Sequence, residues 1–283
     1  MSRSILVADV GGTSSRWVLL KDGDQVEQVI AIGFNPYVSQ NDVLSEIIDN
    51  TVLPKIGGHP DEVHYYGAGC GRSEFQSRVV EILSGSFLNS EVHVQSDLVG
   101  AGRALFANKP GLAVILGTGT NAGYFENGEL IEGIPSIGYL LGDEGSGMDI
   151  GKHFLSAWFW KKLPNDIWQD FKKIVGMEEG ELLRTVYEDP TPNKRIASYT
   201  EFIANHIDDK DLRALVRSRF SVLLNILQEH FGERAKEIGV VGSVGYYFRS
   251  VLEEAASELD LSVTNTIQDP LDAMIEYHSN ELS

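Results

Sequence analysis

The sequence of 283 residues predicts an α/β fold built from two similar halves that face each other across a cleft. Short β-rich runs alternate with helical patterns over the first third of the chain. A unit of strand, glycine turn, strand and Asx-Gly hairpin occurs twice, about 105 residues apart. A chain of this length buries most of the surface that its unfolded form exposes. Its core therefore needs no disulfides, and Cys70 is the single cysteine.

The first half begins with three strands joined by tight turns. Asp22 and Gly23 suit the positive φ angles of a hairpin, so the second and third strands are joined there. Apolar residues at helical spacing then follow capping residues at 39–42. The elements expected in this half are strands at 4–10, 16–20, 25–32, 63–66 and 92–95, helices at 43–52 and 75–83, and a helix that opens at Asp97.

The second half repeats the opening unit and continues as a mostly helical region. Asn108 to Pro110 break the preceding helix, which places the boundary between an N-terminal lobe at 1–107 and a C-terminal lobe with helical insertions at 108–283. The elements expected here are strands at 112–116, 122–125, 238–241 and 261–265, a hairpin turn at 126–129, and helices at 148–161, 166–174, 180–187, 196–206, 212–231 and 270–280.

The charge balance narrows the classes of partner. The chain has 23 Lys and Arg residues against 41 Asp and Glu residues, a net charge of −18. This charge repels nucleic acids and anionic lipids, so neither is expected as a partner. Asp9 interrupts the N-terminal apolar run too early for a signal peptide, and other apolar runs are far too short to span a membrane. We therefore expect a soluble, cytoplasmic protein that meets any anionic substrate with backbone donors or a metal ion.

Residues 9–13 combine a carboxylate, two glycines and a hydroxyl at the end of the first strand. Gly11 and Gly12 let backbone N–H groups approach phosphate oxygens without a Cβ in the way. The Thr13 hydroxyl can donate to the same phosphate, and Asp9 can hold a hydrated Mg²⁺ ion. Taken alone, the segment is equally typical of an ordinary hairpin, and it matches neither a Walker A loop nor a GxGxxG fingerprint.

Two further glycine turns lie at strand ends. The turn at 117–121 occupies the matching place in the second half, so the two turns together could clamp a polyphosphate from both sides. The turn at 242–245 follows a predicted strand and could accept the nucleoside end of the ligand through Gly242 and Ser243. Turns between strands and helices often have this composition, so the third turn alone is a weak signal.

Three acidic residues are candidates for chemistry. Asp97 follows a strand end and begins a helix, where an N-cap is the common alternative role. Asp143 and Glu144 lie in a glycine-rich turn that also begins a helix and could simply cap it. Cys70 is expected to be buried and unreactive. The seven histidines show no metal-ligand spacing, so the sequence does not predict a zinc site.

The motifs together resemble the N-acetylglucosamine kinase family. That family belongs to the actin, sugar kinase and Hsp70 superfamily and is close to the BadF/BadG ATPases. The resemblance spans the whole chain and implies two ribonuclease-H-like lobes, the actin-like ATPase/sugar kinase fold, with ATP–Mg²⁺ bound between them. It rests on residues 9–13, 96–101, 117–121, 142–146 and 241–244.

The resemblance also implies roles for single residues. Asp97 would be the base beside the sugar hydroxyl, and Asp9 would position Mg²⁺ through water. Residues 135–138 read Pro-Ser-Ile-Gly where the family often has Gly-Gly-Trp-Gly, and residues 269–274 lack the usual Gly-Ala pair. The implied ATP-binding residues are Gly11, Gly12, Thr13, Thr118, Gly242 and Ser243, and the implied sugar-binding residues are Asn35, Asp97, Thr120, Asn121, Gly138 and Asp143.

An ATP-dependent sugar kinase is the function that the resemblance implies, with N-acetylglucosamine converted to its 6-phosphate. Phosphoryl transfer depends on positioning and charge neutralisation, which suits turns, hydroxyls and one metal ion.

One alternative is a BadF-type ATPase that activates a partner enzyme, although one cysteine is few for the iron–sulfur cluster those proteins bridge. Another is a kinase for glucosamine, N-acetylmuramic acid or glucose. A sugar-sensing repressor would need a DNA-binding module, and none is recognised before Asp9. Whether two chains form a homodimer is left open by the sequence.

Overall fold

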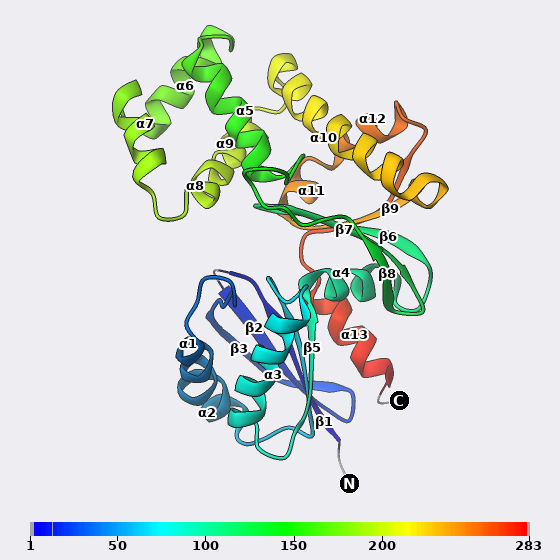
Figure 1. The fold of residues 1–283 in the computed structure, drawn as a ribbon. Coiled ribbons are helices and arrows are strands. Elements are labelled where there is room, and N and C mark those ends of the chain that lie inside the picture. The colour runs from blue at the N-terminus through cyan, green and yellow to red at the C-terminus, as the bar shows by residue number, and fades with distance from the viewer. Residues whose placement is uncertain (1–2, 13, 282–283) are drawn as a thin grey trace. The chain divides into compact units, whose positions relative to one another are not determined.

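The computed structural model describes residues 3–12 and 14–281, which form two compact units. Unit 1 contains Met1–Lys109, Glu126–Leu130 and Pro270–Ser283, and unit 2 contains Pro110–Phe125 and Ile131–Asp269. Each unit has its own five-stranded mixed sheet with helices on it (Figure 1). The predicted α/β class is confirmed. The sequence-based division left the terminal helix α13 (Leu271–Glu281) in the second lobe, whereas the structure packs it within unit 1.

The sheet of unit 1 joins an antiparallel meander to two parallel strands, in the order β3-β2-β1-β4-β5. β1 pairs with β2 in antiparallel and with β4 in parallel orientation, and β4 pairs with β5 in parallel orientation. The carboxyl ends of β1, β4 and β5 therefore meet at one edge, the place where open α/β sheets bind ligands. The strands are β1 (Ser4–Val10), β2 (Ser14–Lys21), β3 (Asp24–Ile32), β4 (Glu62–Gly67) and β5 (Glu91–Ser96).

The two faces of this sheet are covered by different helices (Figure 1). Leu6 and Ala8 alternate toward one face, where they share a core with Leu44 of α1 and Val79 of α3. The opposite face carries α4 and α13, and Gly100 of α4 lets these elements approach closely. The helices are α1 (Asn41–Ile47), the π-helical turn η1 (Ile48–Val52), α2 (Leu53–Ile56), α3 (Ser73–Ser86) and α4 (Asp97–Phe106).

The sheet of unit 2 has the same arrangement, in the order β10-β9-β6-β7-β8. β6 pairs with β7 in antiparallel and with β9 in parallel orientation, and β9 pairs with β10 in parallel orientation. The internal repeat in the sequence thus corresponds to two sheets of equal topology. The strands are β6 (Gly111–Leu116), β7 (Thr120–Glu126), β8 (Glu129–Gly133), β9 (Glu237–Val241) and β10 (Ser262–Ile267).

The helices of unit 2 share one large apolar core. Trp158 and Trp168 stack with their ring centroids 5.1 Å apart, and each indole donates to the other residue's carbonyl. The predicted helix at 196–206 is divided at Tyr199. The helices are α5 (Gly147–Phe159), α6 (Asn165–Val175), α7 (Glu179–Glu188), α8 (Pro192–Ser198), α9 (Thr200–Asn205), α10 (Lys210–Phe231), the 3₁₀ turn η2 (Gly232–Ala235), α11 (Ser243–Tyr247) and α12 (Arg249–Ser257).

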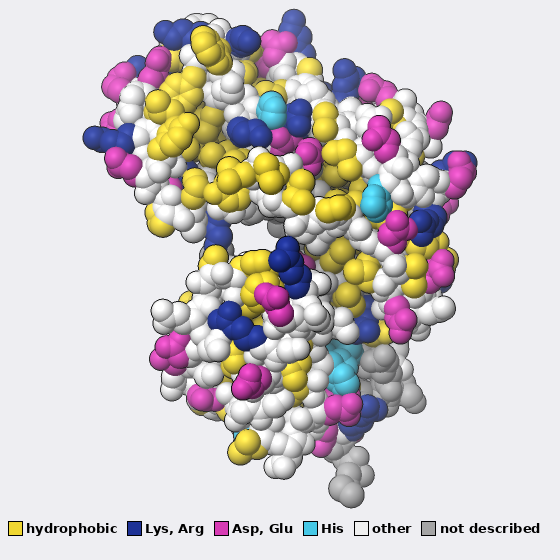
Figure 2. All heavy atoms as spheres, in the orientation of Figure 1, with side chains coloured by type: hydrophobic (Ala, Val, Ile, Leu, Met, Phe, Trp, Pro, Cys, Tyr) yellow, Lys and Arg dark blue, Asp and Glu magenta, His cyan; other side chains and the backbone are white. Residues whose placement is uncertain are grey.

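The surface view places most of the visible apolar side chains on unit 2. In Figure 2 they gather over the helices labelled α5 to α9 in Figure 1. Exposed apolar residues of these helices and their ends are Trp160 after α5, Ile174 of α6 and Tyr187 of α7. None of the helices that the structure describes combines the length and the apolar character needed to cross a membrane.

Candidate active site

The carboxyl end of β1 presents Asp9 next to the first glycine turn. Asp9 lies opposite Arg16 in the β1–β2 ladder, and Arg16 Nη2 donates to Asp9 Oδ2 over 2.6 Å. The turn is closed by the Gly11 N–H, which donates to the Ser14 carbonyl over 3.0 Å. A Cβ built at Gly12 would have no described atom within 4 Å, so the backbone is accessible there. Thr13, the predicted phosphate donor, lies outside the described residues.

Asp97 stands where β5 passes into α4. The N-cap of α4 is Ser96, whose hydroxyl accepts the Val99 N–H over 3.3 Å, so the alternative role of Asp97 as N-cap is wrong. Asp97 Oδ1 accepts the adjacent Leu98 N–H over 2.9 Å. Burial raises the pKa of Asp97 to about 6, and the negative charge of Asp9 contributes to the increase. A carboxylate with a pKa in this range is suited to accept a proton near neutral pH.

Asn35 follows β3 and lies against the turn after β4. Its Oδ1 accepts the Tyr37 N–H over 3.0 Å, an Asx turn that holds the loop. Gly69 has φ +84°, and a Cβ there would lie 2.6 Å from Asn35 Oδ1. The Ala68 N–H donates to the Val10 carbonyl over 2.9 Å. Asn35, Asp9 and Asp97 therefore come from loops and strand ends at one edge of the unit 1 sheet.

In unit 2 the second glycine turn joins β6 to β7. Its Gly117 and Thr118 carbonyls accept the N–H groups of Gly147 and Met148, which begin α5. The Thr118 side chain is exposed, and a Cβ at Gly117 would meet no described atom. The turn thus keeps an accessible surface at the position that matches Gly11 and Gly12 in unit 1.

A loop of residues 142–146 folds back onto this turn. Asp143 has φ +60°, and its Oδ1 accepts the Thr120 N–H over 3.2 Å. A Cβ at Gly119 would lie 2.8 Å from Asp143 Oδ2, so this approach requires a glycine. Thr120 is buried, and its hydroxyl donates to the Glu144 carbonyl over 2.8 Å. Burial raises the pKa of Asp143, and the nearby Glu144 and Asp149 add to the effect.

The remaining predicted sugar ligands are Asn121, at the start of β7, and Gly138, just before this loop. Asn121 Oδ1 accepts the Ala122 N–H over 3.0 Å. Gly138 has φ +74° and accepts the N–H groups of Leu141 and Gly142 with its carbonyl. In this conformation Gly138 forms the turn through which the divergent segment 135–138 leads into the loop.

The third glycine turn contributes to a cavity within unit 2. Gly242 has φ +122°, and a Cβ there would lie 2.3 Å from the Leu116 carbonyl oxygen. Ser243 and Thr118 line a cavity of about 630 Å³, a size typical of small-molecule sites. The cavity thus brings the second and third predicted ATP-binding turns together, and α8, α9 and α11 complete its wall.

The comparisons with known proteins bear on this arrangement. No family model and no curated protein matches the sequence. Among solved structures, a proposed N-acetylglucosamine kinase from Porphyromonas gingivalis is 29% identical, with a TM-score of 0.91 over 99% of this chain and 100% of that chain. A second, from Chromobacterium violaceum, is 16% identical, with a TM-score of 0.78 over 97% and 98%. The ROK hexokinase from Thermus thermophilus shares the fold at 14% identity, with a TM-score of 0.53 over 99% and 98%.

The chain is an ATP-dependent phosphotransferase with the actin-like ATPase fold. The predicted fold and the resemblance to the N-acetylglucosamine kinases are both confirmed, since the similarity extends over the whole length of each chain.

Sequence reasoning missed several residues that shape the site of this kinase. Lys194 and Glu201 line the cavity from α8 and α9, which carry no motif, and Tyr247 lies at the end of α11, beyond the motif at 241–244. Arg16 could have been found, because alternation places it opposite Asp9 once the hairpin is predicted.

Asp149 is the other residue that was missed. It lies in α5, and its Oδ2 accepts the Gly145 N–H over 3.0 Å and Arg219 Nε over 2.8 Å. Burial alone would raise the pKa of Asp149, but the bonds from His153, Arg219 and Gly145 outweigh it and lower this pKa to about 2. Asp149 therefore fixes the loop that carries Asp143.

Proposed function

We propose that this kinase transfers the γ-phosphoryl group of ATP to a hydroxyl of an amino sugar, with N-acetylglucosamine and its 6-phosphate as substrate and product. The observation that carries the proposal is the cavity that joins the Thr118 and Ser243 turns in unit 2, matched by an equivalent glycine turn and an acidic strand edge in unit 1. The similarity to a proposed N-acetylglucosamine kinase over the whole chain supports this choice of substrate.

The residues of unit 2 would hold the nucleotide. Backbone N–H groups of the turn at Gly117 and the Thr118 hydroxyl would donate to phosphate oxygens. Ser243 and the helices of the cavity wall would contact the nucleoside end. In unit 1, Gly11, Gly12 and Thr13 would contact phosphate from the equivalent turn. These donors are needed because the protein's net charge of −18 gives no general attraction for an anion.

Asp97 would act as the base in the chemical step. The substrate hydroxyl would give its proton to the Asp97 carboxylate while its oxygen forms the new bond to the γ-phosphorus. The bond between that phosphorus and the β–γ bridging oxygen breaks, and ADP leaves with the electron pair. General-base catalysis of this kind contributes about 10²–10⁴-fold. Asn35, Thr120, Asn121, Asp143 and the backbone of Gly138 would orient the sugar.

The acidic strand edge fits the donor chemistry of magnesium. Mg²⁺ prefers carboxylate and water oxygens, and Asp9 and Asp97 supply carboxylates close enough for the charge of one to raise the pKa of the other. Arg16 occupies Oδ2 of Asp9, which suits a residue that holds the ion through water. When bound, Mg²⁺ would neutralise charge on the transferring phosphoryl group.

The experiment that tests this proposal is a coupled ADP-release assay over a panel of sugars. We expect the largest stimulation with N-acetylglucosamine, a smaller one with glucosamine, N-acetylmuramic acid or glucose, and a phosphorylated product at the 6-hydroxyl by NMR. ATP turnover that no sugar stimulates would contradict the kinase and favour the partner-activating ATPase. Cys70 argues against that alternative, because it is fully buried and burial raises its thiol pKa to about 12.

A further inference from the structure

Two neighbouring strands of unit 1 carry the same tripeptide in register. β4 begins Glu62, Val63, His64, and β5 begins Glu91, Val92, His93. In the parallel ladder Glu62 lies opposite Glu91, and His64 lies opposite His93. Side chains two residues apart share a face of a strand, so both glutamates and both histidines lie on one face. Val63 points to the other face and joins the apolar core.

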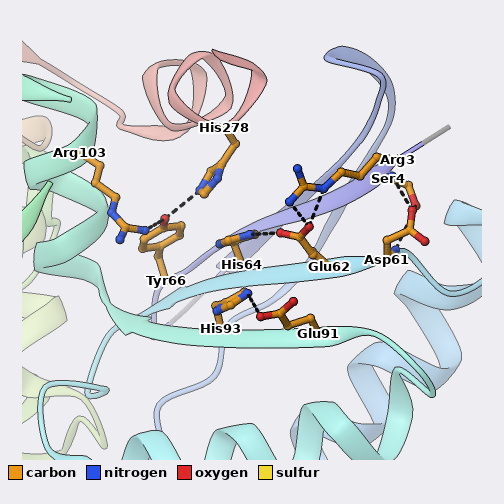
Figure 3. A network of polar contacts seen from close by, with 10 residues as sticks. All are labelled: Arg3, Ser4, Asp61, Glu62, His64, Tyr66, Glu91, His93, Arg103 and His278. Atoms are coloured by element: carbon orange, nitrogen blue, oxygen red, sulfur yellow. Dashed lines mark hydrogen bonds and ion pairs between the residues drawn. The ribbon is translucent and has the colours of Figure 1, made fainter. Parts of the chain in front are cut away.

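The side chains on this face are close together (Figure 3). The His64 and His93 rings stack with centroids 4.6 Å apart. His64 Nε2 lies 3.1 Å from Glu62 Oε2. One ligating atom from each of Glu62, His64 and His93 falls within 4.8 Å of the others. A tetrahedral zinc site with bonds of about 2.0–2.1 Å has its donor atoms about 3.3 Å apart, so small side-chain rotations would complete it.

Neighbouring residues hold these donors in place. Arg3 donates to Oε1 of Glu62, which directs Oε2 toward His64 (Figure 3). His93 Nε2 lies 3.3 Å from Glu91 Oε1, so a second carboxylate is close to the nitrogen that would bind the ion. His278 of α13 packs on the His64 ring with centroids 4.2 Å apart. The residues that surround Glu62, His64 and His93 therefore hold these three side chains in place.

Charge and access also favour a cation. Asp61, Glu62 and Glu91 supply three carboxylates, against the guanidinium groups of Arg3 and Arg103 (Figure 3). The His93 side chain is 39% exposed, whereas those of His64 and Glu62 are 12% and 13% exposed. An ion from solvent can thus reach His93 first and be enclosed by the two more buried donors.

We propose that Glu62, His64 and His93 form a binding site for one divalent transition-metal ion, with Zn²⁺ as the best-suited ion. Two imidazoles and one carboxylate match the donor preference of Zn²⁺, and water takes the fourth position on the exposed side. The Glu91 carboxylate adds negative charge beside His93. The site is distinct from the Mg²⁺ position proposed at the opposite ends of the strands, where β1 and β5 lead to Asp9 and Asp97.

Spacing along the sequence could not reveal this site, because its ligands come from two strands that the fold brings together. Zn²⁺ would join β4 to β5, so it would stabilise the pair of strands that leads to the Gly67 turn and to Asp97. A ligand that binds the folded state alone raises the melting temperature by mass action.

The test uses the full chain, free of any affinity tag, titrated with Zn²⁺ against a chromophoric chelator. We expect one ion per chain with a Kd below about 10 µM, and a higher Tm in its presence. Co²⁺ should give the visible absorption of a tetrahedral N/O site. His93→Gln should weaken binding about 100-fold or more. Glu91→Gln removes only a neighbouring negative charge and should weaken binding less.

The matched control is His230→Gln, since His230 pairs with Glu132 over 3.4 Å but belongs to no metal-ligand group among the described residues. It should bind Zn²⁺ as the unaltered chain does. The proposal is overturned if the unaltered chain binds no Zn²⁺ below about 100 µM, or if His93→Gln binds it equally well. Sugar phosphorylation plays no part in these readouts, so they are independent of the proposed function.

Discussion

Asp97 is a buried carboxylate in the first turn of α4, and the N-cap of that helix is the preceding residue, Ser96. Because Ser96 makes the capping bond, changing Asp97 to Asn removes the proposed base and leaves the cap intact. We expect Asp97→Asn to lower kcat by about 10²-fold or more, with a near-normal Tm and ATP affinity. Ser96→Ala is the matched control and should lower stability by about 1 kcal/mol through the lost cap. A fully active Asp97→Asn variant would remove Asp97 from the mechanism.

The raised pKa of Asp97 leads to a prediction about the pH dependence of the proposed reaction. A base works only when deprotonated, and burial together with Asp9 raises this pKa to about 6. We expect kcat/KM to be level above pH 7 and to fall about tenfold per unit below pH 6. The profile should be measured with saturating Mg²⁺ and with coupling enzymes shown to remain in excess. A rate that stays constant down to pH 5 would contradict this assignment.

The sequence indicated some of the residues at the candidate site and gave no sign of others. Asp97 was predicted because it follows a strand end and matches a motif, while Asp149 resembles an ordinary residue in the first turn of a helix. The partner of Asp149 is Arg219, 70 positions away on another helix. No local pattern indicates such a pair, since it depends on how α5 and α10 pack.

At the scale of elements, the loop 142–146 is held in place by Asp149. The side chain of Asp149 is 5% exposed, and its pKa of about 2 lies below the ordinary 3.8. A lowered pKa stabilises the folded state fully above the unfolded value, and this contribution is lost as pH falls toward 2. We expect Asp149→Asn to lower the free energy of unfolding by about 2 kcal/mol at pH 7. It should also raise the KM for sugar, because the loop carries Asp143.

Urea unfolding at pH 7, 5 and 3 measures this effect. The difference between the unaltered chain and Asp149→Asn should shrink between pH 5 and pH 3, because protonation of Asp149 in the unfolded chain favours that state. Asp170→Asn is a suitable control, since Asp170 is 60% exposed and lies 3.9 Å from His206. It should change stability by less than about 0.5 kcal/mol. An equal loss in both variants at pH 7 would show that the hydrogen bonds of Asp149 are not the cause.

The secondary structure was well predicted where short-range rules decide it. Short β-rich runs indicated every strand of the two sheets except β8, and Asp22 with Gly23 indicated the first hairpin, where both residues have positive φ. The predicted helix at 196–206 failed because it is interrupted at Tyr199, whose ring packs against Phe171. The cavity wall that α8 and α9 provide could not be foreseen, because its residues share no motif.

At the scale of the whole molecule, the repeat of about 105 residues predicted two sheets of equal topology, and both have that topology. The sequence did not predict that α13 returns to unit 1. Local patterns show that α13 is a helix, but its partner is set by complementary surfaces such as Gly100 against Met274. Contacts between distant segments are therefore the part of the fold that sequence reading leaves undetermined.

The charge imbalance of the whole chain makes a prediction about salt. The excess of 41 acidic over 23 basic residues produces mutual repulsion that salt screens, with a Debye length of about 10 Å at 0.1 M. Many ion pairs, such as Arg217 with Glu258, are exposed and contribute only about 0–1 kcal/mol each. Screening these pairs therefore removes less stability than screening the net repulsion adds. We therefore expect the Tm to rise by about 2–4 °C between 20 and 500 mM NaCl, equivalent to about 1 kcal/mol in a protein of this size. KCl should act equally, because screening depends on ionic strength. A Tm that falls with both salts would show that the ion pairs, rather than the net charge, dominate the electrostatic stability.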